Sequence, residues 1–555
     1  MNADLDSRIQ ARELLHRGRA AFDVLRRFSQ QDVDRICYAM VEAGYRASEQ
    51  LAKMAVEESG FGTVPGKIAK NRFSTRGLWA HIRDMKTCGL IRSDEGRGVF
   101  EYGDPFGVIA AIIPTTNPTS TAMFKAIISV KSRNAMVTSP HPRAVGCINE
   151  SIRILHEAAV AAGAPRDLIT CMDKVSLDGT DELMRHEQTD LILATGGAGL
   201  VRAAYSSGKP AFGVGPGNSP AWIDRSADLS KAARCLVDSQ TFDNGTICAS
   251  EQSLVIDRPI REAFLAEMRR RKAHHCSAGE AEALAKIVSV RGGMNPKIVG
   301  LAPSRLAQMA GFSVPDDTTI LLADCQGVGR EYPLSIEKLC PILSMFTADG
   351  WKEGCERCLE VLRFGGMGHT LAIHCTDEGI IREFAEKKPV NRLVVNSPSS
   401  QGAVGFTTNL APSMTLGCGS FGGNITSDNI GPMHLLNIKR LAYVVPEYDS
   451  PDWGQEFPDV GPAGSSAPTP RAFVPQKSSE PKTLWQPKFS QSPTKAADVP
   501  PAEPPAPKTA GVYNENSDQE LRAIIADALG TKRSDNCPFG RCAECPPTGD
   551  CEKCS

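Results

Sequence analysis

The chain has 555 residues, of which 41% are apolar and 23% are charged. These fractions are ordinary for globular proteins, so they exclude a fibrous or wholly disordered chain. The formal net charge of −2 excludes a strongly basic surface, and nucleic acid is therefore not an expected partner. No apolar run approaches the ~20 residues of a membrane-spanning helix, and the first residues show no secretory signal. We expect a cytoplasmic protein without a membrane partner.

The first 200 residues predict an α/β fold. Residues 11–28 and 31–54 carry apolar side chains three and four positions apart, which is typical of amphipathic helices. Short apolar runs then alternate with helical patterns, as in a parallel sheet that is covered on both faces. The predicted elements are strands at 107–113, 135–138 and 191–194, and helices at 119–130 and 144–162.

One cysteine lies in an informative segment. Residues 241–252 read Thr-Phe-Asp-Asn-Gly-Thr-Ile-Cys-Ala-Ser-Glu-Gln, so that Asn244 and Gly245 come shortly before Cys248. A single cysteine near a glycine is usually a small core residue. This segment, however, closely resembles the nucleophile loop of the aldehyde dehydrogenase superfamily, and the resemblance implies that Cys248 is the catalytic nucleophile.

Four further segments resemble motifs of that superfamily, in the expected order. Residues 114–118 (Pro-Thr-Thr-Asn-Pro) stand where the family has its oxyanion-hole asparagine, which here is Asn117. Residues 195–199 resemble its cofactor-contacting glycine loop, and residues 337–341 its motif with a ribose-binding glutamate. Residues 405–410 match the terminal part of its catalytic domain, so the resemblance covers nearly all of 10–445.

The resemblance implies an NAD cofactor. Ser139 stands where the family usually has a lysine that contacts the adenosine ribose, which leaves the choice between NAD and NADP open. The implied cofactor-binding residues are Thr115, Ser139, His141, Pro142, Thr195, Gly196, Gly197, Gly215, Glu337 and Leu339.

One departure from the family pattern predicts the type of reaction. Hydrolytic members carry a Glu-Leu-Gly-Gly motif whose glutamate activates water, but residues 213–220 read Gly-Val-Gly-Pro-Gly-Asn-Ser-Pro, without a carboxylate. Loss of a general base slows water attack by about 10²–10⁴-fold. The variant resembles the CoA-acylating aldehyde dehydrogenases, including microcompartment enzymes for acetaldehyde and propionaldehyde, and residues 139–144 and 416–424 also look like that branch. Coenzyme A is therefore the expected acyl acceptor.

The implied mechanism uses three residues. The Cys248 thiolate attacks the aldehyde, and the alkoxide is bound by the Asn117 amide and the Cys248 backbone N–H. His369 resembles a histidine of the acylating branch and is a candidate acid or base; the alternative is a histidine satisfied by loop backbone. Cys355 and Cys358 are interpreted as incidental. Two alternative functions are a hydrolytic aldehyde dehydrogenase and a scaffold or metal-binding protein with a vestigial enzyme body.

The sequence predicts six segments. Residues 446–508 hold 15 of the 38 prolines, which indicates an extended linker. From the family we expect a homodimer or homotetramer. The predicted segments are an NAD-binding domain (1–225, with an oligomerisation strand near 94–104), a catalytic domain (226–432), an oligomerisation strand (433–445), a proline-rich linker (446–513), an amphipathic tail helix (514–532) and a cysteine-rich tail (533–555).

The tail helix has its own start signal. Residues 517–520 form a capping box, and apolar residues follow at helical spacing from Leu521 to Leu529. A helix this short needs a partner for its apolar stripe. It looks like the encapsulation peptides that direct enzymes into bacterial microcompartments, so shell proteins are expected partners and the microcompartment lumen is the expected location; the alternative is docking on the enzyme body.

The cysteine-rich tail offers two Cys-x-x-Cys pairs. Four thiolates are able to bind zinc in a tetrahedral site, and an iron–sulfur cluster is a second interpretation. The spacing between the pairs is short for a zinc ribbon, and a thiol-rich end without metal is the third interpretation. The candidate ligands are Cys542, Cys545, Cys551 and Cys554.

Overall fold

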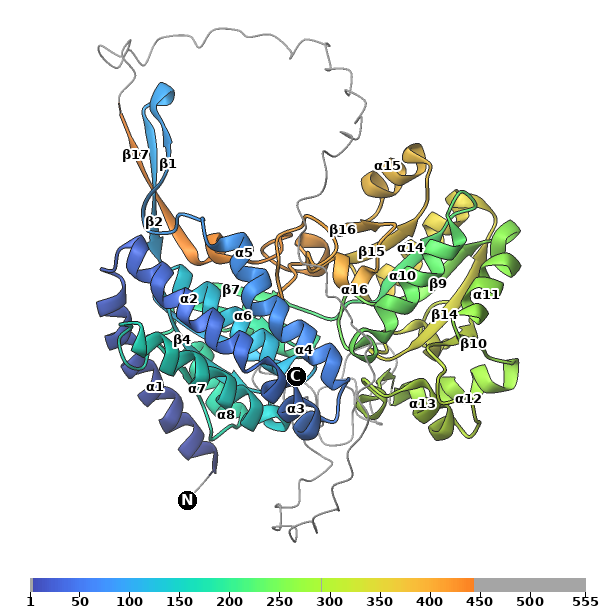
Figure 1. Cartoon of the computed structure of the whole chain (residues 1–555), viewed down its shortest axis with the longest axis horizontal. Helices are drawn as coiled ribbons and strands as arrows, with labels where there is room; N and C mark the ends of the chain where they lie inside the picture. The colour runs from blue at the N-terminus through green and yellow to red at the C-terminus, as the bar shows by residue number, and fades with distance from the viewer. Residues whose placement is uncertain (1–2, 291, 444–555) are drawn as a thin grey trace, which may run out of the picture. The chain divides into compact units, whose positions relative to one another are not determined.

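The computed structural model describes residues 3–290 and 292–443. The predicted linker, tail helix and cysteine-rich tail, with Cys542, Cys545, Cys551 and Cys554, lie outside the described residues. Among the described helices, none is both long enough and apolar enough to cross a bilayer. The fold is mixed α/β with parallel sheets, as predicted (Figure 1).

A five-stranded sheet organises the first domain. Its strand order is β5-β4-β3-β6-β7, and all neighbouring strands are parallel. Every residue of β3 and β4 is buried, because helices cover both faces and leave no polar side to the strand. The strands are β3 (Val108–Ile113), β4 (Ala135–Pro140), β5 (Ile169–Cys171), β6 (Leu191–Thr195) and β7 (Ala211–Val214).

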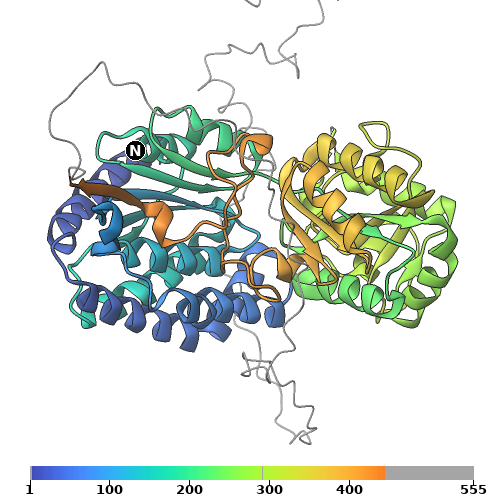
Figure 2. The same ribbon diagram turned by 90° about the horizontal axis from the view of Figure 1, so that it is seen from above.

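The helices of this domain form one core with the sheet, and the N-terminal helices run along one side of it (Figure 2). The pattern at 31–54 predicted continuous helix, but the structure ends α2 at Arg46 and begins α3 at Ser48. The break coincides with the Ser48 hydroxyl, which donates to the Gly44 carbonyl at 3.1 Å. The helices are α1 (Ala3–Leu25), α2 (Gln30–Arg46), α3 (Ser48–Ser59), α4 (Val64–Arg72), α5 (Leu78–Ile82), α6 (Pro118–Lys131), α7 (Val145–Ala161), α8 (Leu177–Arg185) and α9 (Ala198–Tyr205).

A seven-stranded parallel sheet organises the second domain, in the order β10-β13-β14-β9-β8-β15-β16. The strands are β8 (Ser219–Ile223), β9 (Glu251–Asp257), β10 (His274–His275), β13 (Leu321–Asp324), β14 (Ile342–Ala348), β15 (Gly368–His374) and β16 (Val390–Val395); β11 (Ser289–Val290) pairs separately with β12 (Gly293–Met294). The helices are α10 (Leu229–Thr241), α11 (Arg261–Arg270), α12 (Ala278–Val288), α13 (Pro303–Ala310), α14 (Gly350–Gly365), α15 (Glu378–Lys387) and α16 (Ser399–Gly402).

The change of sheet differs from the predicted boundary at 225. Strand β8 pairs with β9 and β15, so the second sheet already begins at Ser219. Strands β7 and β8 are both short and apolar, and a glycine-rich turn separates them. Their sequences therefore do not indicate which sheet each strand joins. Near the other boundary, Ile430 and Leu435 pack in the core of the first domain. Cys355 and Cys358 are buried in an apolar cluster, which is consistent with a packing role.

Three antiparallel strands form a third sheet, with β2 in the middle: β1 (Gly89–Asp94), β2 (Val99–Pro105) and β17 (Leu436–Ala442) (Figure 1). Lys439 pairs with Tyr102, so segments more than 300 residues apart lie side by side. Five of the seven residues of β17 are exposed. The predicted oligomerisation strands fall in this sheet, and their role in assembly stays a prediction.

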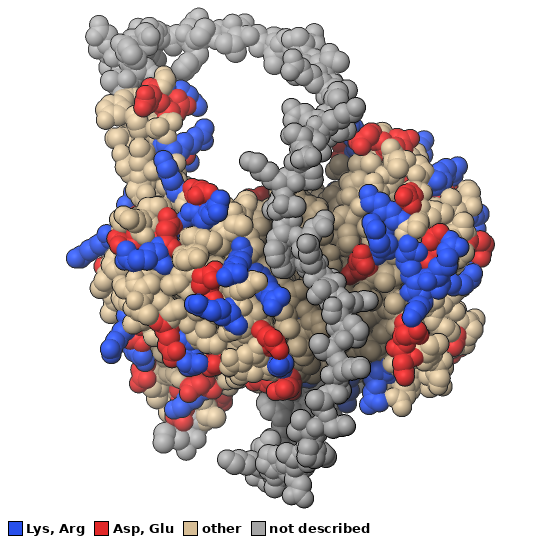
Figure 3. All heavy atoms as spheres, in the orientation of Figure 1, with Lys and Arg blue, Asp and Glu red and all other residues tan. Residues whose placement is uncertain are grey.

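The surface carries charges of both signs. On the face drawn in Figure 3, Lys and Arg side chains are interspersed with Asp and Glu, without a large region of one sign. This distribution agrees with the near-zero net charge of the sequence.

Candidate active site

The predicted nucleophile loop is a tight left-handed turn between α10 and β9. Asp243 and Asn244 have φ of 54° and 50°, and Gly245 continues the turn with φ of 70°. Asn and Asp tolerate this conformation better than other side chains because their polar groups bond locally. The turn ends in Cys248, which is partly exposed between the buried residues Ile247 and Ala249.

Burial and charge set the protonation of Cys248. The pKa of the Cys248 thiol is raised to about 12, chiefly by burial and next by the charges of Glu337 and Cys418. The buried Arg392 guanidinium acts in the opposite direction and lowers this pKa. Cys248 is therefore a neutral thiol in the unliganded protein, and its attack on a carbonyl needs a base to remove the proton.

Asn117 lies directly before α6, at the end of the loop that follows β3. Its Oδ1 accepts a hydrogen bond from Lys70 Nζ at 2.6 Å, and Lys70 Nζ also donates to the Thr246 carbonyl at 3.0 Å. The asparagine is thus linked through one lysine to the turn that carries Cys248. The structure brings the predicted oxyanion-hole residue and the predicted nucleophile loop together.

Glu337 and His369 meet the nucleophile loop at Gly217. The Gly217 N–H donates to Glu337 Oε1 at 2.9 Å. A Cβ atom at Gly217 would lie 2.4 Å from the Cys248 carbonyl oxygen and 2.9 Å from His369 Cγ, so only glycine fits there. The segment that lacks the water-activating carboxylate therefore lies against both the nucleophile and the histidine.

His369 is a buried, neutral imidazole. Burial, with a smaller effect of the Arg392 charge, lowers its pKa to about 3. Its Nδ1 is 2.9 Å from the Thr370 hydroxyl, whereas the buried Nε2 has no hydrogen-bond partner among the described residues. The ring is not satisfied by loop backbone, so that interpretation is wrong. A buried nitrogen without a partner is rare, so this ring has one unused hydrogen-bonding atom.

The cofactor candidates gather at the carboxyl edge of the five-stranded sheet. Thr115 follows β3, Ser139 lies in β4 with His141 and Pro142 after it, and Gly215 follows β7. Thr195 ends β6, and Gly196 and Gly197 lead into α9. Since β4 and β6 flank β3 on opposite sides, the chain changes direction at β3, and such switch points are where parallel sheets bind nucleotides.

The residues at this edge fit a nucleotide cofactor. The Thr195 hydroxyl is buried without a hydrogen-bond partner in the described residues, and a Cβ at Gly197 or Gly215 would meet no atom within 4 Å. This edge of the sheet therefore has a hydroxyl without a hydrogen-bond partner and open space beside the backbone of Gly197 and Gly215. Ser139 and His141 differ, because Ser139 Oγ lies 2.8 Å from Thr180 Oγ1 and His141 Nδ1 accepts from the Arg143 N–H.

Glu337 and Leu339 come from the other domain. Burial raises the pKa of the Glu337 carboxyl to about 8. Leu339 has a left-handed backbone with φ of 52°, and its carbonyl accepts from the Gly300 N–H at 2.9 Å. Glu337 and Cys248 both lie against Gly217, so Glu337 is close to the place where the reaction is predicted to occur.

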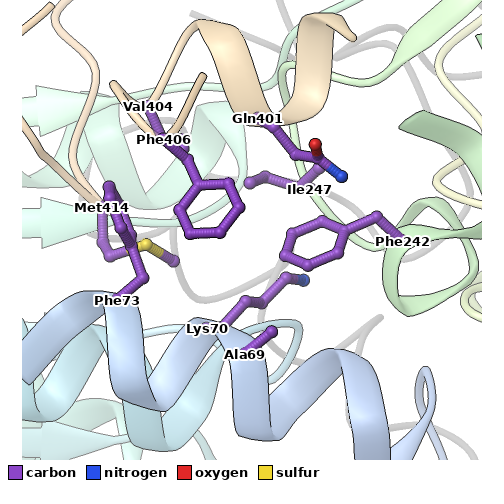
Figure 4. Close-up of a pocket in the computed structure, with 9 residues that line it drawn as sticks. All are labelled: Ala69, Lys70, Phe73, Phe242, Ile247, Gln401, Val404, Phe406 and Met414. Atoms are coloured by element: carbon purple, nitrogen blue, oxygen red, sulfur yellow. The ribbon is translucent and has the colours of Figure 1, made fainter. Parts of the chain in front are cut away.

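A small apolar pocket is lined in part by residues of the segment that leads to Cys248 (Figure 4). Phenylalanine side chains from three segments point toward one another in it, and Ile247, the neighbour of Cys248, closes one side. The interior has room for about one water molecule. The lining residues are Ala69, Lys70, Phe73, Phe242, Ile247, Gln401, Val404, Phe406 and Met414.

One cluster among the described residues has metal-ligand spacing, formed by His274, Cys276 and Glu280. Its groups already have partners. Glu280 accepts from the Ser277 N–H at 2.7 Å and from the Ser277 hydroxyl, and His274 Nε2 lies 3.3 Å from the same carboxylate. A helix cap accounts for this cluster.

Sequence reasoning did not find Lys67, Lys70 or Asp243, which surround Asn117 and the nucleophile turn. Lysine is usually exposed, so two lysines in a helix give no sign of burial. The aromatic lining of the pocket also went unnoticed, because it comes from segments far apart in the sequence.

Known proteins are similar to this chain over most of its described residues. The sequence profile described as the aldehyde dehydrogenase family matches residues 3–285. The bifunctional aldehyde-alcohol dehydrogenase AdhE of Escherichia coli is 43% identical over 420 residues, which are 75% of this chain and 47% of that enzyme. The chain therefore spans about half the length of this relative. The acetylating succinate-semialdehyde dehydrogenase of Clostridium kluyveri is 35% identical over 456 residues, which cover 81% of this chain and 100% of the relative.

Solved structures are similar over the same region. An acetylating aldehyde dehydrogenase from Geobacillus thermoglucosidasius has a TM-score of 0.80 and 48% identity, and the match covers 80% of this chain and 99% of that one. A propionaldehyde dehydrogenase from the fucose utilisation microcompartment of Clostridium phytofermentans has a TM-score of 0.70 and 29% identity, over 78% and 97%. One from Rhodopseudomonas palustris, with bound CoA and an acylated cysteine, has 0.70 and 26%, also over 78% and 97%. The chain belongs to the aldehyde dehydrogenase family.

Proposed function

We propose that the chain oxidises a short aldehyde with NAD and coenzyme A to the acyl-CoA, through a thioester on Cys248. One observation carries this proposal: the segment that packs against Cys248 contributes Gly217 and no carboxylate. The carboxyl whose charge acts most strongly on Cys248 is Glu337, and it already accepts from the Gly217 N–H. Glu337 also stands in the segment that the resemblance assigns to cofactor binding, so the proposed mechanism gives it no role in activating water.

The relatives support an acylating reaction. Two of them are named acetylating enzymes, and the R. palustris structure contains both CoA and an acylated cysteine. A thioester reacts readily with a second thiol, so CoA takes the acyl group where activated water is missing. The alternative is hydrolysis, in which some other group of this chain activates water.

The chain's residues divide the reaction among them. His369 takes the proton of the Cys248 thiol, and the sulfur attacks the carbonyl carbon of the aldehyde. The Asn117 amide and the Cys248 N–H donate to the oxygen as it becomes negative. Bound NAD supplies the hydride acceptor, with Thr195 and Glu337 as the proposed contacts. The acyl group then rests on Cys248, and His369 releases its proton to solvent. His369 next takes the proton of the CoA thiol, whose sulfur attacks the thioester carbon, and returns that proton to the Cys248 thiolate that leaves.

The small pocket of Figure 4 has no room for a substrate, but its lining supports an uncharged one. Its lining is largely apolar and aromatic, and Lys70 is the sole cation in it. The Lys70 ammonium is already bonded to Asn117 and Asp243, so it is not available to an acidic substrate. We therefore propose propionaldehyde or acetaldehyde rather than an aldehyde with a carboxylate, such as the one named in the C. kluyveri relative.

Location and assembly are proposals that rest on the family. The microcompartment origin of one solved relative supports the lumen as the location, with residues 514–532 binding shell proteins. A homodimer or homotetramer is proposed from the resemblance. Metal binding by the four tail cysteines stays a prediction, which metal analysis of the full chain measures.

The dependence of NADH formation on CoA tests the reaction. Purified protein is mixed with NAD and propionaldehyde, with and without CoA, and succinic semialdehyde is the acidic comparison. We expect sustained turnover only with CoA, a preference of at least tenfold for propionaldehyde, and no turnover by Cys248→Ala. Equal turnover without CoA would establish the hydrolytic alternative, and a preference for the acidic aldehyde would overturn the substrate proposal.

A further inference from the structure

Helix α4 carries two lysines into the protein interior. Lys67 and Lys70 are three residues apart and therefore share one face of the helix, and their side chains are each 2% exposed. The helix is capped by the Thr63 hydroxyl, which accepts from the Gly66 N–H at 3.1 Å. Burying an ammonium group is unfavourable unless it is paired and hydrogen-bonded, so the partners of these lysines explain their position.

Both lysines pair with one carboxylate of the nucleophile turn. Asp243 Oδ2 accepts from Lys67 at 2.8 Å, from Lys70 at 2.5 Å and from the Thr246 hydroxyl at 2.6 Å. Asp243 Oδ1 accepts from the Thr63 N–H at 2.7 Å. A Cβ at Gly66 would lie 2.6 Å from Asp243 Cα, so the helix and the turn are in backbone contact. Asp243 therefore fixes α4 against the turn that leads to Cys248.

The remaining hydrogen bonds of the lysines extend to the loop before α6. Lys67 donates to the Thr116 carbonyl at 2.7 Å, and Lys70 donates to Asn117 Oδ1 at 2.6 Å. An ammonium group has donors only, so the oxygen of the Asn117 amide must be the atom that faces Lys70. This fixes the orientation of the amide, and Nδ2 with its two hydrogens faces away from the lysine.

The Nδ2 group of Asn117 is left nearly unused. Its one hydrogen-bond partner among the described residues is the Thr116 hydroxyl at 3.4 Å, which is a long contact. A donor in this state is ready to bind a negative oxygen without first giving up a strong bond. The amide is also polarised by the cation at its other end, which strengthens its N–H groups as donors.

We propose that Lys70 is a positioning residue of the oxyanion hole, which holds the Asn117 amide with its N–H groups toward the substrate oxygen and connects it to the Cys248 turn. This inference rests on the proposed function, because it takes the role of Asn117 from there. Lys70 donates hydrogen bonds to Asn117 Oδ1, to Asp243 and to the Thr246 carbonyl. One side chain therefore fixes the Asn117 amide relative to the turn that carries the Cys248 N–H. Lys67 supports the loop through Thr116.

A double-mutant cycle tests the inference. We compare Lys70→Met, Asn117→Ala and the double variant by CoA-dependent NADH formation, with thermal unfolding and NAD binding as measures of folding. Asn117→Ala is expected to lower kcat by about 10²–10³-fold, as for loss of an oxyanion donor. Lys70→Met is expected to lower kcat by about 10–10²-fold in the wild-type background and by less than about threefold in the Asn117→Ala background.

Two further variants separate positioning from a structural role. Lys131→Met removes an equally buried, carboxylate-paired lysine at the opposite end of α6, and its kcat is expected within about threefold of wild type. Lys70→Gln keeps an N–H donor for Asn117 Oδ1 without the charge, and it is expected to regain part of the activity lost in Lys70→Met. This variant also keeps the test open if Lys70→Met does not fold.

The outcomes distinguish the inference from the proposed function. Equal losses from Lys70→Met in both backgrounds, or equal kcat in Lys70→Met and Lys131→Met, would overturn the positioning role while Asn117 kept its own. Wild-type activity in Asn117→Ala would instead overturn the proposed oxyanion hole. A Lys70→Gln variant no better than Lys70→Met would contradict the hydrogen bond as the cause.

Discussion

The nucleophile turn and the cofactor edge differ in how many of their polar groups have hydrogen-bond partners within the protein. At the nucleophile turn, the Asp243 carboxylate accepts from four donors, and Lys70 makes three hydrogen bonds. At the cofactor edge, the Thr195 hydroxyl has no partner among the described residues and Gly197 faces open space. One region is complete without ligand, and the other lacks the partners that a ligand would bring.

This difference indicates how the two regions divide the proposed reaction between them. Groups that stabilise a charge appearing during the reaction need fixed positions before substrate arrives. Groups that recognise a cofactor gain their hydrogen bonds from it and are unsatisfied without it. Changes at the nucleophile turn are therefore expected to affect stability or kcat, whereas changes at the cofactor edge are expected to affect KM for NAD.

His369 gives the largest expected effect, because it combines a fixed position with an unused nitrogen. We expect His369→Ala to lower kcat by about 10²–10⁴-fold, as for loss of a general base. His374→Ala is the matched control, since His374 lies in the same strand, is equally buried and has a pKa lowered to about 4. The measurement is CoA-dependent NADH formation.

The pH profile of that reaction sharpens the assignment. With its pKa lowered to about 3, His369 stays neutral throughout the range from pH 5 to 9. The profile should therefore have no step near the ordinary histidine pKa of about 6.5. A step there that disappears in His369→Ala would contradict the neutral imidazole.

Asp243 gives the next largest effect, on stability. Asp243→Asn leaves two buried ammonium groups without their counter-charge, and breaking a buried ion pair costs about 3–5 kcal/mol. Asp257→Asn is the control: Asp257 is also fully buried, but its partner Arg225 is 57% exposed and returns to water. Denaturant unfolding measures both, and an equal loss in the two variants would contradict the buried network.

Glu337 predicts a dependence of stability on pH. Its pKa is raised from 4.5 to about 8 in the folded protein, so the folded state binds this proton more tightly than the unfolded state. The resulting stability is fully present below pH 4.5 and is lost as pH rises through 8. We expect the melting temperature of the wild type to fall relative to Glu337→Gln between pH 5 and 9, without NAD present. A constant difference would show that the carboxyl is ionised throughout.

Thr195 gives the smallest effect, at the cofactor edge. Thr195→Val removes a hydroxyl without an internal partner, so stability should not change, whereas KM for NAD should rise about three- to tenfold for one lost hydrogen bond. Thr138→Val is the control, because that hydroxyl is also buried and unpartnered but lies inside β4. Equal changes of KM for NAD in the two variants would contradict the assignment of Thr195 to the cofactor site.

The sequence predicted the sheet of the first domain well and the environment of the nucleophile poorly. Strands β3, β4 and β6 are continuous apolar runs, which only a sheet covered on both faces accommodates. Motifs predict the roles of Cys248 and Asn117, and these roles stay predictions. The bond from Lys70 to Asp243 joins residues 173 positions apart, and no local pattern encodes such a pairing. No local pattern in the sequence indicates to which sheet β8 belongs either.

The state of Cys248 during the reaction tests the central claim most directly. The protein is incubated with propionaldehyde and NAD without CoA, and the mass of the peptide that contains Cys248 is measured before and after CoA is added. We predict a propionyl group on Cys248 that persists in water and leaves as propionyl-CoA when CoA is added. Rapid release of propionate without CoA, or an acyl group on another cysteine, would contradict the account.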